Sequence, residues 1–247
     1  MQVQCIVGNA TYSADLSGGY DLSVGIGPGG DNPNAFFIDR AEFEPFRAGG
    51  FIGNVSLGGS ANCEVIRFCA HGNGTHTECV GHLSRDRFSL NRLITRFVYT
   101  AQLVTVTLNA LDRGEAITRQ MLEGKYLLPV DALIVRTIPN DDAKKGWEWS
   151  GHNPPFFAPE TLAWLRDCGY RHLLTDLPSV DPEEDEGLLS AHHAWWNYPE
   201  APREDSTITE MIYVDNGIKD GLYLLNLQFP PFESDASPSR PVIYPLV

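Results

Sequence analysis

The middle of the chain carries the clearest hydrophobic pattern. Residues 131–136 form a short apolar run of the kind found in a strand that is covered on both faces. Residues 158–169 predict a helix, with Pro159 and Glu160 in its first turn and a glycine at its end. Residues 172–175 predict the next strand. Strand, helix and strand in this order indicate a βαβ crossover and at least one parallel pair of strands.

Other short apolar runs predict further elements on both sides of this unit. On the N-terminal side, glycine-punctuated or β-branched runs predict strands at residues 20–26, 51–57, 65–70 and 103–108. On the C-terminal side, we expect a helix at 188–196, strands at 208–214 and 222–229, and an edge strand at 241–244. No fixed-period repeat or linker divides the chain, so we predict one mixed α/β domain over residues 1–247, with a mixed sheet and few helices.

Two polar segments interrupt this pattern. Residues 27–36 (GPGGDNPNAF) lack the lysine and the following helix of a phosphate-binding loop, so we expect a turn or a loop that covers a substrate. Residues 183–186 (EEDE) are interpreted as a solvated acidic loop.

The charge balance excludes some partners. The sequence has 18 basic and 32 acidic residues, a formal net charge of −14. Such a chain repels phosphate groups, so we expect no binding to nucleic acid or to anionic membranes. The first residues lack the basic and apolar regions of a secretory signal, and no apolar run is long enough to span a membrane. The five cysteines show no CxxC spacing, so we expect reduced thiols and a cytoplasmic protein.

The candidate chemistry lies between residues 71 and 82. Three of the seven histidines, His71, His76 and His82, fall in this stretch, together with Glu78. In an extended segment, His76 and Glu78 project to the same side, because side chains alternate with a period of two. An imidazole and a carboxylate that converge in this way suit a divalent transition metal such as zinc or manganese.

The remaining histidines and Cys79 leave alternatives open. His152 lies in a polar loop, where it either contacts a substrate or has a structural role. His172 begins a buried strand, and we interpret it as structural. Cys79 lies within the histidine-rich stretch, so a cysteine nucleophile is an alternative chemistry, although no basic residue is dedicated to it.

Three blocks of the sequence together resemble one family. Residues 74–78 (GTHTE) with His82 resemble the HxGTHxDxPxH motif of the metal-dependent cyclase family, whose members include bacterial kynurenine formamidases. Residues 175–182 (TDLPSVDP) and 190–194 (SAHHA) resemble its second block, and residues 207–212 (TITEMI) resemble its I-L-E-G strand. The blocks follow the order of the family from about residue 72 to residue 212.

The resemblance implies roles only where residues match. His76 falls on the second metal-binding histidine, Glu78 on the metal-bridging aspartate and His82 on the histidine that transfers protons. His192 and Glu210 fall on the two distal metal ligands. The first histidine of the family falls on Gly72, whereas this chain has His71 one position earlier, so a local bulge is needed to aim His71 as a ligand. Val80 replaces the proline of the motif, and one or two ions are compatible with this set.

The resemblance also implies a fold, a reaction and an assembly. The expected fold is the swivelling β/β/α arrangement, as a homodimer or homotetramer. The expected reaction is hydrolysis of an amide, a formamide or a lactone-type bond in a small molecule, in which hydroxide at the metal attacks the carbonyl and His82 shuttles the proton. The expected substrate contacts are His193, Trp195 and His152, although Trp195 and Trp196 are equally compatible with a place in the core.

Because the motif departs from that of the family, a second class of function stays open. A protein with the same scaffold can bind a metal or a small molecule without catalysis. Metal that is bound without turnover of any carbonyl substrate would indicate this alternative.

Overall fold

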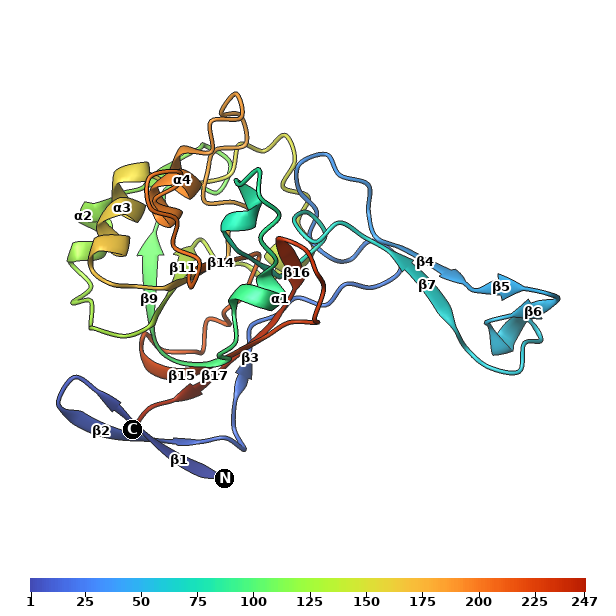
Figure 1. Cartoon of the computed structure of the whole chain (residues 1–247), viewed down its shortest axis with the longest axis horizontal. Helices are drawn as coiled ribbons and strands as arrows, with labels where there is room; N and C mark the ends of the chain where they lie inside the picture. Colours follow the sequence, from blue (N-terminus) through green and yellow to red (C-terminus); the bar gives the residue numbers. More distant parts are fainter.

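A mixed sheet of nine strands organises the molecule. A computed structural model describes residues 1–247 (Figure 1). The strands lie in the order β16 (Ala236–Pro238), β8 (His76–Glu78), β14 (Thr207–Glu210), β13 (His172–Thr175), β11 (Ala132–Ile138), β9 (Val98–Thr107), β15 (Gly221–Gln228), β17 (Arg240–Pro245) and β3 (Tyr20–Asp21). The four central strands β9, β11, β13 and β14 are parallel neighbours, and the outer strands are antiparallel.

The predicted βαβ unit is present. Helix α3 (Pro159–Asp167) begins with proline, carries Glu160 in its first turn and connects β11 to the parallel strand β13. Every residue of β11 except Ile138 is buried, which agrees with the unbroken apolar run in its sequence. The prediction of a mixed α/β fold with few helices is therefore confirmed.

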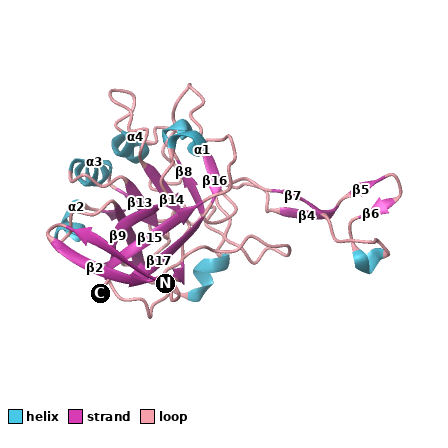
Figure 2. Cartoon of the chain, turned by 60° about the horizontal axis from the view of Figure 1, so that its bottom comes forward, coloured by secondary structure: helices cyan, strands magenta, loops and turns pink.

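Short helices cover one face of the sheet, as Figure 2 shows. They are α1 (Leu90–Leu93), α2 (Arg119–Glu123), α3 and α4 (Ser190–Trp196), and 3₁₀ turns span Val55–Leu57, Val80–His82 and Asp142–Gly146. Alternate residues of the central strands enter two apolar cores. Leu133 and Val135 pack with the helices α3 and α4, whereas Ala132 and Ile134 pack on the opposite face with residues such as Leu22 and Val214.

Four small sheets surround this body. Strands β1 (Gln2–Val7) and β2 (Ala10–Asp15) form an N-terminal hairpin, and β10 (Ala116–Ile117) pairs with β12 (Phe156–Phe157). Strands β4 (Glu42–Pro45) and β7 (Glu64–Arg67), with β5 (Arg47–Ala48) and β6 (Phe51–Ile52), form an arm that extends away from the body (Figure 1). No helix combines the length and the hydropathy that a membrane crossing requires.

Several predicted elements are shorter than their sequence pattern, for local reasons. The strand expected at 208–214 spans Thr207–Glu210 instead and ends there, because Met211 adopts a left-handed backbone with φ 53°. The helix expected from residue 188 begins at Ser190, after Leu189 with φ 45°. At 51–57, Asn54 accepts a hydrogen bond from the Leu57 backbone and starts a 3₁₀ turn instead of a longer strand. The 241–244 strand is not at the edge, because β3 pairs outside it.

One buried ion pair connects the loop after β11 to the end of β13. Lys144 Nζ lies 2.8 Å from Asp176 Oδ2, and both side chains are fully buried. The same ammonium donates to Thr137 Oγ1, which itself donates to Asp176 Oδ1 at 3.0 Å, and the Thr137 backbone N–H donates to Asp176 Oδ2 at 2.9 Å. Asp176 therefore has partners for both of its oxygens, and the pair positions the segment that follows β13.

We expect Lys144→Met to destabilise the protein by about 3–5 kcal/mol, because it leaves the Asp176 carboxylate buried without a counter-charge. Lys145→Met is the matched control. Lys145 pairs with Asp142 at the surface, so its loss is expected to cost less than about 1 kcal/mol. Urea unfolding of both variants measures the difference, and equal small losses would show that the buried pair is dispensable.

Candidate metal centre

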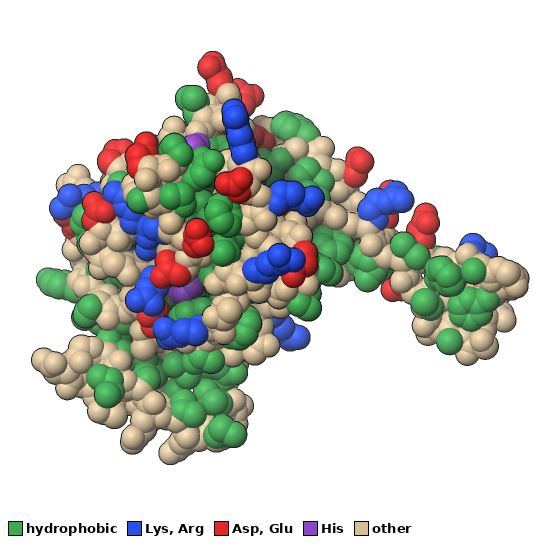
Figure 3. All heavy atoms as spheres, in the orientation of Figure 1, with side chains coloured by type: hydrophobic (Ala, Val, Ile, Leu, Met, Phe, Trp, Pro, Cys, Tyr) green, Lys and Arg blue, Asp and Glu red, His purple; other side chains and the backbone are tan.

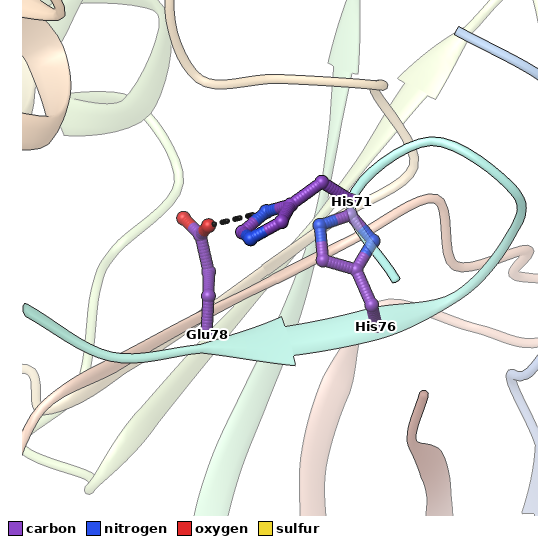
Figure 4. Close-up of side chains that lie close together, drawn as sticks. All are labelled: His71, His76 and Glu78. Atoms are coloured by element: carbon purple, nitrogen blue, oxygen red, sulfur yellow. Dashed lines mark ion pairs between the residues drawn. The ribbon is translucent and has the colours of Figure 1, made fainter. Parts of the chain in front are cut away.

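Strand β8 provides the two central side chains. His76 and Glu78 project from the same side of β8, as the alternation of an extended segment requires (Figure 4). Thr77, between them, bonds the side chain of Thr209 instead. All three β8 residues are buried. Antiparallel pairing with β14 sets Glu210 opposite His76, and the His76 Nε2 atom lies 3.3 Å from Glu210 Oε2.

Helix α4 delivers His192 to the same point. The His192 Nε2 atom lies 3.0 Å from Glu78 Oε1, and its Nδ1 atom lies 2.5 Å from Asp181 Oδ2. Asp181 also accepts the backbone N–H groups of Ala191 and His192, so a single carboxylate both caps the helix and orients the imidazole. Trp196, one helical turn later, stacks on the His192 ring.

His71 and His82 complete the cluster, together with a carboxylate that the sequence analysis missed. His71 Nδ1 lies 3.1 Å from Glu78 Oε2, and His71 Nε2 lies 2.9 Å from Asp235 Oδ2. His82 Nδ1 lies 3.5 Å from Asp235 and 3.7 Å from Glu78. Asp235 precedes β16, which pairs with β8, and the Cys79 N–H donates to the Asp235 carbonyl. That long-range pairing leaves no local sequence signal.

The position of the histidine at residue 71 rather than 72 has a steric reason, and His71 lies in a turn before β8 rather than in a strand. A side chain at Gly72 would place its Cβ 2.6 Å from Ile38 Cδ1 and 3.1 Å from the Ala35 carbonyl, so a histidine does not fit there. The Ala35 N–H in turn donates to the Gly72 carbonyl. The loop at residues 32–40 thus occupies the space beside position 72, and His71 reaches the cluster from the preceding residue.

The electrostatics of the cluster favour cations. Burial opposes the charged form of each group, but the neighbouring imidazoles of His82 and His192 still hold the pKa of Glu78 well below its usual value. Burial likewise disfavours charge on His71, yet the neighbouring carboxylates of Asp235 and Glu78 raise its pKa to about 10. The pKa of His192 is raised in the same way, against burial, by Glu78 and Asp181. The carboxylates therefore attract positive charge strongly into this space.

The donor set fits a divalent metal ion. His76 Nε2 and Glu78 Oε2 are buried and make no hydrogen bond, which is costly unless another partner is present. Three overlapping groups have ligand atoms that lie within 4.8 Å of one another, namely His71, His76 and Glu78; His71, His82 and Asp235; and Glu78, His82 and His192. Imidazole nitrogens combined with carboxylate oxygens suit zinc or manganese.

A cavity of about 330 Å³ opens beside this cluster. His71, Glu78, His82, His192 and Glu210 form its inner wall. Its outer wall consists of Phe36, Ser179, Pro182, Glu183, Asp185 and Leu189. Two of these, Glu183 and Asp185, belong to the acidic segment 183–186, so the loop that we expected to be solvated also lines the cavity on one side. Phe36 ends the glycine-rich segment 27–36, which agrees with a loop that covers the site.

Three expected substrate contacts lie elsewhere. His193 turns away from the cavity, and its Nδ1 atom lies 2.8 Å from the Tyr198 carbonyl oxygen. Trp195 is fully buried in the core beneath the guanidinium of Arg203. His152 is exposed beside Trp147. The structure therefore corrects the expectation that His193, Trp195 and His152 line the substrate cavity.

Two other sequence interpretations concern buried groups. Cys79 is buried against the Phe88 carbonyl, and burial raises the pKa of its thiol to about 12, so the alternative of a cysteine nucleophile is not supported. His172 is buried against Tyr99 and Thr207, and burial lowers its pKa to about 4, which agrees with a structural role.

Comparisons with known proteins identify relatives of this chain. Residues 20–182 match the model of a family described as "Putative cyclase". Kynurenine formamidase of Bacillus mycoides (strain KBAB4) is 28% identical over 189 residues, which cover 76% of this chain and 82% of that protein. Kynurenine formamidase of Bordetella petrii is 26% identical over 183 residues, covering 74% and 80%.

Solved structures share the fold at lower sequence identity. A predicted metal-dependent hydrolase from Bacillus stearothermophilus superposes with a TM-score of 0.64 at 16% identity, covering 92% of this chain and 98% of that one. Isatin hydrolase A from Labrenzia aggregata superposes with a TM-score of 0.62 at 14% identity, covering 92% and 93%.

We expect Asp181→Asn to weaken zinc binding about 10–100-fold, because the Asn side chain no longer fixes the ring of His192 with a full carboxylate. Asp167→Asn, an exposed substitution at the end of α3, is the control and should leave the affinity unchanged. Competition with a zinc chelator of known affinity measures both. An unchanged affinity in Asp181→Asn would mean that His192 does not bind the ion.

Proposed function

The chain belongs to the cyclase family, and we propose that it is a metal-dependent hydrolase of a small amide, formamide or lactone-type substrate. The observation that carries this proposal is the convergence of β8, α4, β14 and the segment before β16 on one cluster of side chains beside a small cavity. Two buried ligand atoms there, His76 Nε2 and Glu78 Oε2, lack hydrogen bonds. Relatives named kynurenine formamidase and isatin hydrolase, which share the fold, support an amide-type carbonyl as the reacting group.

We propose that His71, His76, Glu78, His192 and Glu210 hold the metal, with zinc as the resident ion and manganese as the alternative. When bound, such an ion supplies a Lewis acid that polarises a carbonyl and makes a water more acidic. The overlapping ligand groups around Glu78 support one or two ions. Glu78 contacts both His71 and His192, so its carboxylate would be a ligand shared between two ions if two were held.

His82 is the proposed proton carrier. Its ring is about one-quarter exposed at the cavity wall and lies beside Asp235 and Glu78, which hold its Nδ1 side. Imidazole exchanges protons near neutral pH, so His82 can accept the proton of the attacking water. As the oxygen of that water bonds to the carbonyl carbon and the C–N bond breaks, the same proton passes to the leaving nitrogen. Asp235 is a positioning residue for both His71 and His82.

We expect His82→Ala to lower kcat by about 10²–10⁴-fold on formylated aromatic amines while zinc stays bound, because proton transfer is lost but the innermost ligands remain. Formate release and metal content measure the two effects. His193→Ala, whose side chain lies outside the cavity, is the control and should keep its activity. The panel also includes isatin-like lactams and lactones.

Each outcome of that experiment discriminates between the proposals. Zinc bound in the wild type without turnover of any carbonyl substrate would overturn the hydrolase and favour a binding protein. Activity that survives chelation but not thiol alkylation would favour cysteine chemistry.

We also propose that the protein is a homodimer whose arm packs against the second copy. The arm, residues 42–67, is a two-stranded ribbon, which is marginally stable in isolation. It nevertheless exposes apolar side chains on both faces, since the consecutive residues Val65 and Ile66 are each about half exposed. At its tip, Val55 and Leu57 are 54% and 56% exposed. Figure 3 shows such apolar side chains gathered on the end of the arm.

We expect the double variant Val55→Ser and Leu57→Ser to shift the dimer towards monomer, because it removes apolar surface that the partner copy covers. Tyr126→Ser, which removes an exposed apolar residue from the body, is the control. Light scattering after size-exclusion chromatography measures the mass. A wild type of monomeric mass at micromolar concentration would overturn the proposed assembly.

A further inference from the structure

The acidic segment 183–186 is divided between the cavity and the solvent. Glu183 and Asp185 are partly buried and line the cavity, whereas Glu184 and Glu186 are exposed and do not. The loop between β13 and α4 that carries them rises at the top of the view in Figure 1, where Figure 3 shows acidic side chains. Two of four consecutive acidic residues thus face the substrate space.

Both inward carboxylates are held in place by neutral donors. Glu183 accepts the backbone N–H groups of Gly151 and Asn153 at 2.7 and 3.2 Å. Asp185 accepts those of Gly187 and Leu189 at 2.8 and 2.6 Å. Backbone amides carry no net charge, so they fix the two carboxylates without cancelling their negative charge.

The wall of the cavity away from the metal cluster provides no positive charge for an anionic substrate. No lysine or arginine is among the lining residues, and the histidines among them all belong to the metal cluster, where they face the carboxylates of Glu78 and Glu210. Within the same cavity, Glu78 Oε2 is buried and makes no hydrogen bond, although His71 Nδ1 lies 3.1 Å from it, so this oxygen independently marks a place for a ligand.

The remaining wall is apolar and pre-formed. Phe36, Pro182 and Leu189 line it. The loop that carries Phe36 is fixed by the Ala35 N–H bond to Gly72 and by the Phe37 N–H bond to Ser150 Oγ at 2.9 Å. A substrate therefore meets an aromatic surface and two carboxylates opposite the metal ligands. The cavity volume of about 330 Å³ is at the lower end of the range for ligand pockets. A charged group on a substrate in this cavity therefore lies close to the carboxylates of Glu183 and Asp185.

We infer that Glu183 and Asp185 make the cavity select amides with a cationic or neutral apolar body and reject those that carry a carboxylate. The inference rests on the proposed function for its substrate class. Its physical basis is that a like charge is repelled, and an opposite charge attracted, most strongly in a confined space with little water.

The experiment compares three formanilides that differ only at the para position: aminomethyl, hydroxymethyl and carboxyl. We expect kcat/KM to be highest for the ammonium substrate, intermediate for the neutral substrate and lowest for the carboxylate substrate. The ratio between the ammonium and the carboxylate substrates should be at least about tenfold, which corresponds to about 1.4 kcal/mol. The double variant Glu183→Gln and Asp185→Asn should remove most of this preference. The control is the double variant Glu184→Gln and Glu186→Gln, which removes the same number of negative charges from the exposed side of the loop. It should retain the preference for the ammonium substrate.

A binding measurement separates failure of this inference from failure of the proposed function. Calorimetric titration with benzyltrimethylammonium, which cannot coordinate a metal, and with benzyl alcohol reports charge selection without turnover. The double variant of the inward residues should weaken binding of the cation and leave that of the alcohol unchanged.

The outcomes are then distinct. Equal turnover or a preference for the carboxylate would overturn the selection by charge, as would unchanged cation binding in the inward variant. Absence of turnover for all three formanilides and for the lactams and lactones of the panel, together with the expected cation binding, would overturn the hydrolase and leave the charge selection standing.

Discussion

The structure around the cavity depends on the buried carboxylate of Glu78. An ionised carboxylate without water must be paired, because its desolvation costs several kcal/mol. Here the compensation comes from imidazoles on separate segments, His71 before β8 and His192 on α4. The requirement for positive charge at one buried point thus explains why distant parts of the chain meet there.

The sheet determines where that point lies. The parallel strands β13 and β14 both end at this edge, and Glu210 is the last residue of β14. Strand β8 runs antiparallel to β14, so that His76 at its start lies beside Glu210 at the end of its neighbour. Ligand sites in open α/β sheets commonly lie beyond the carboxyl ends of the strands. Because β8 is antiparallel, its first residue, His76, lies at this same edge. In a purely parallel sheet, the first residue of each strand would lie at the opposite edge.

Much of this arrangement could be predicted from local pattern. The shared side of His76 and Glu78 follows from the period of a strand, and the βαβ unit follows from an apolar run, a capped helix and a second run. In α4, successive residues point about 100° apart, so the adjacent His192 and His193 cannot both face the cavity. The helical spacing could be inferred from the sequence, but it does not determine whether His192 or His193 faces the cavity. Asp181 decides this by binding His192.

The parts that the sequence could not predict depend on contacts between distant segments. Asp235 reaches the cluster because β16 pairs with β8, across more than 150 residues of chain. Likewise, four consecutive acidic residues contain no information about which carboxylates turn inward, since this depends on the backbone of residues 151–153 that binds Glu183. Composition indicated a solvated loop because most acidic runs are solvated. The same loop is acidic on the outside for solubility and on the inside beside the substrate space, and only the tertiary contacts distinguish the two.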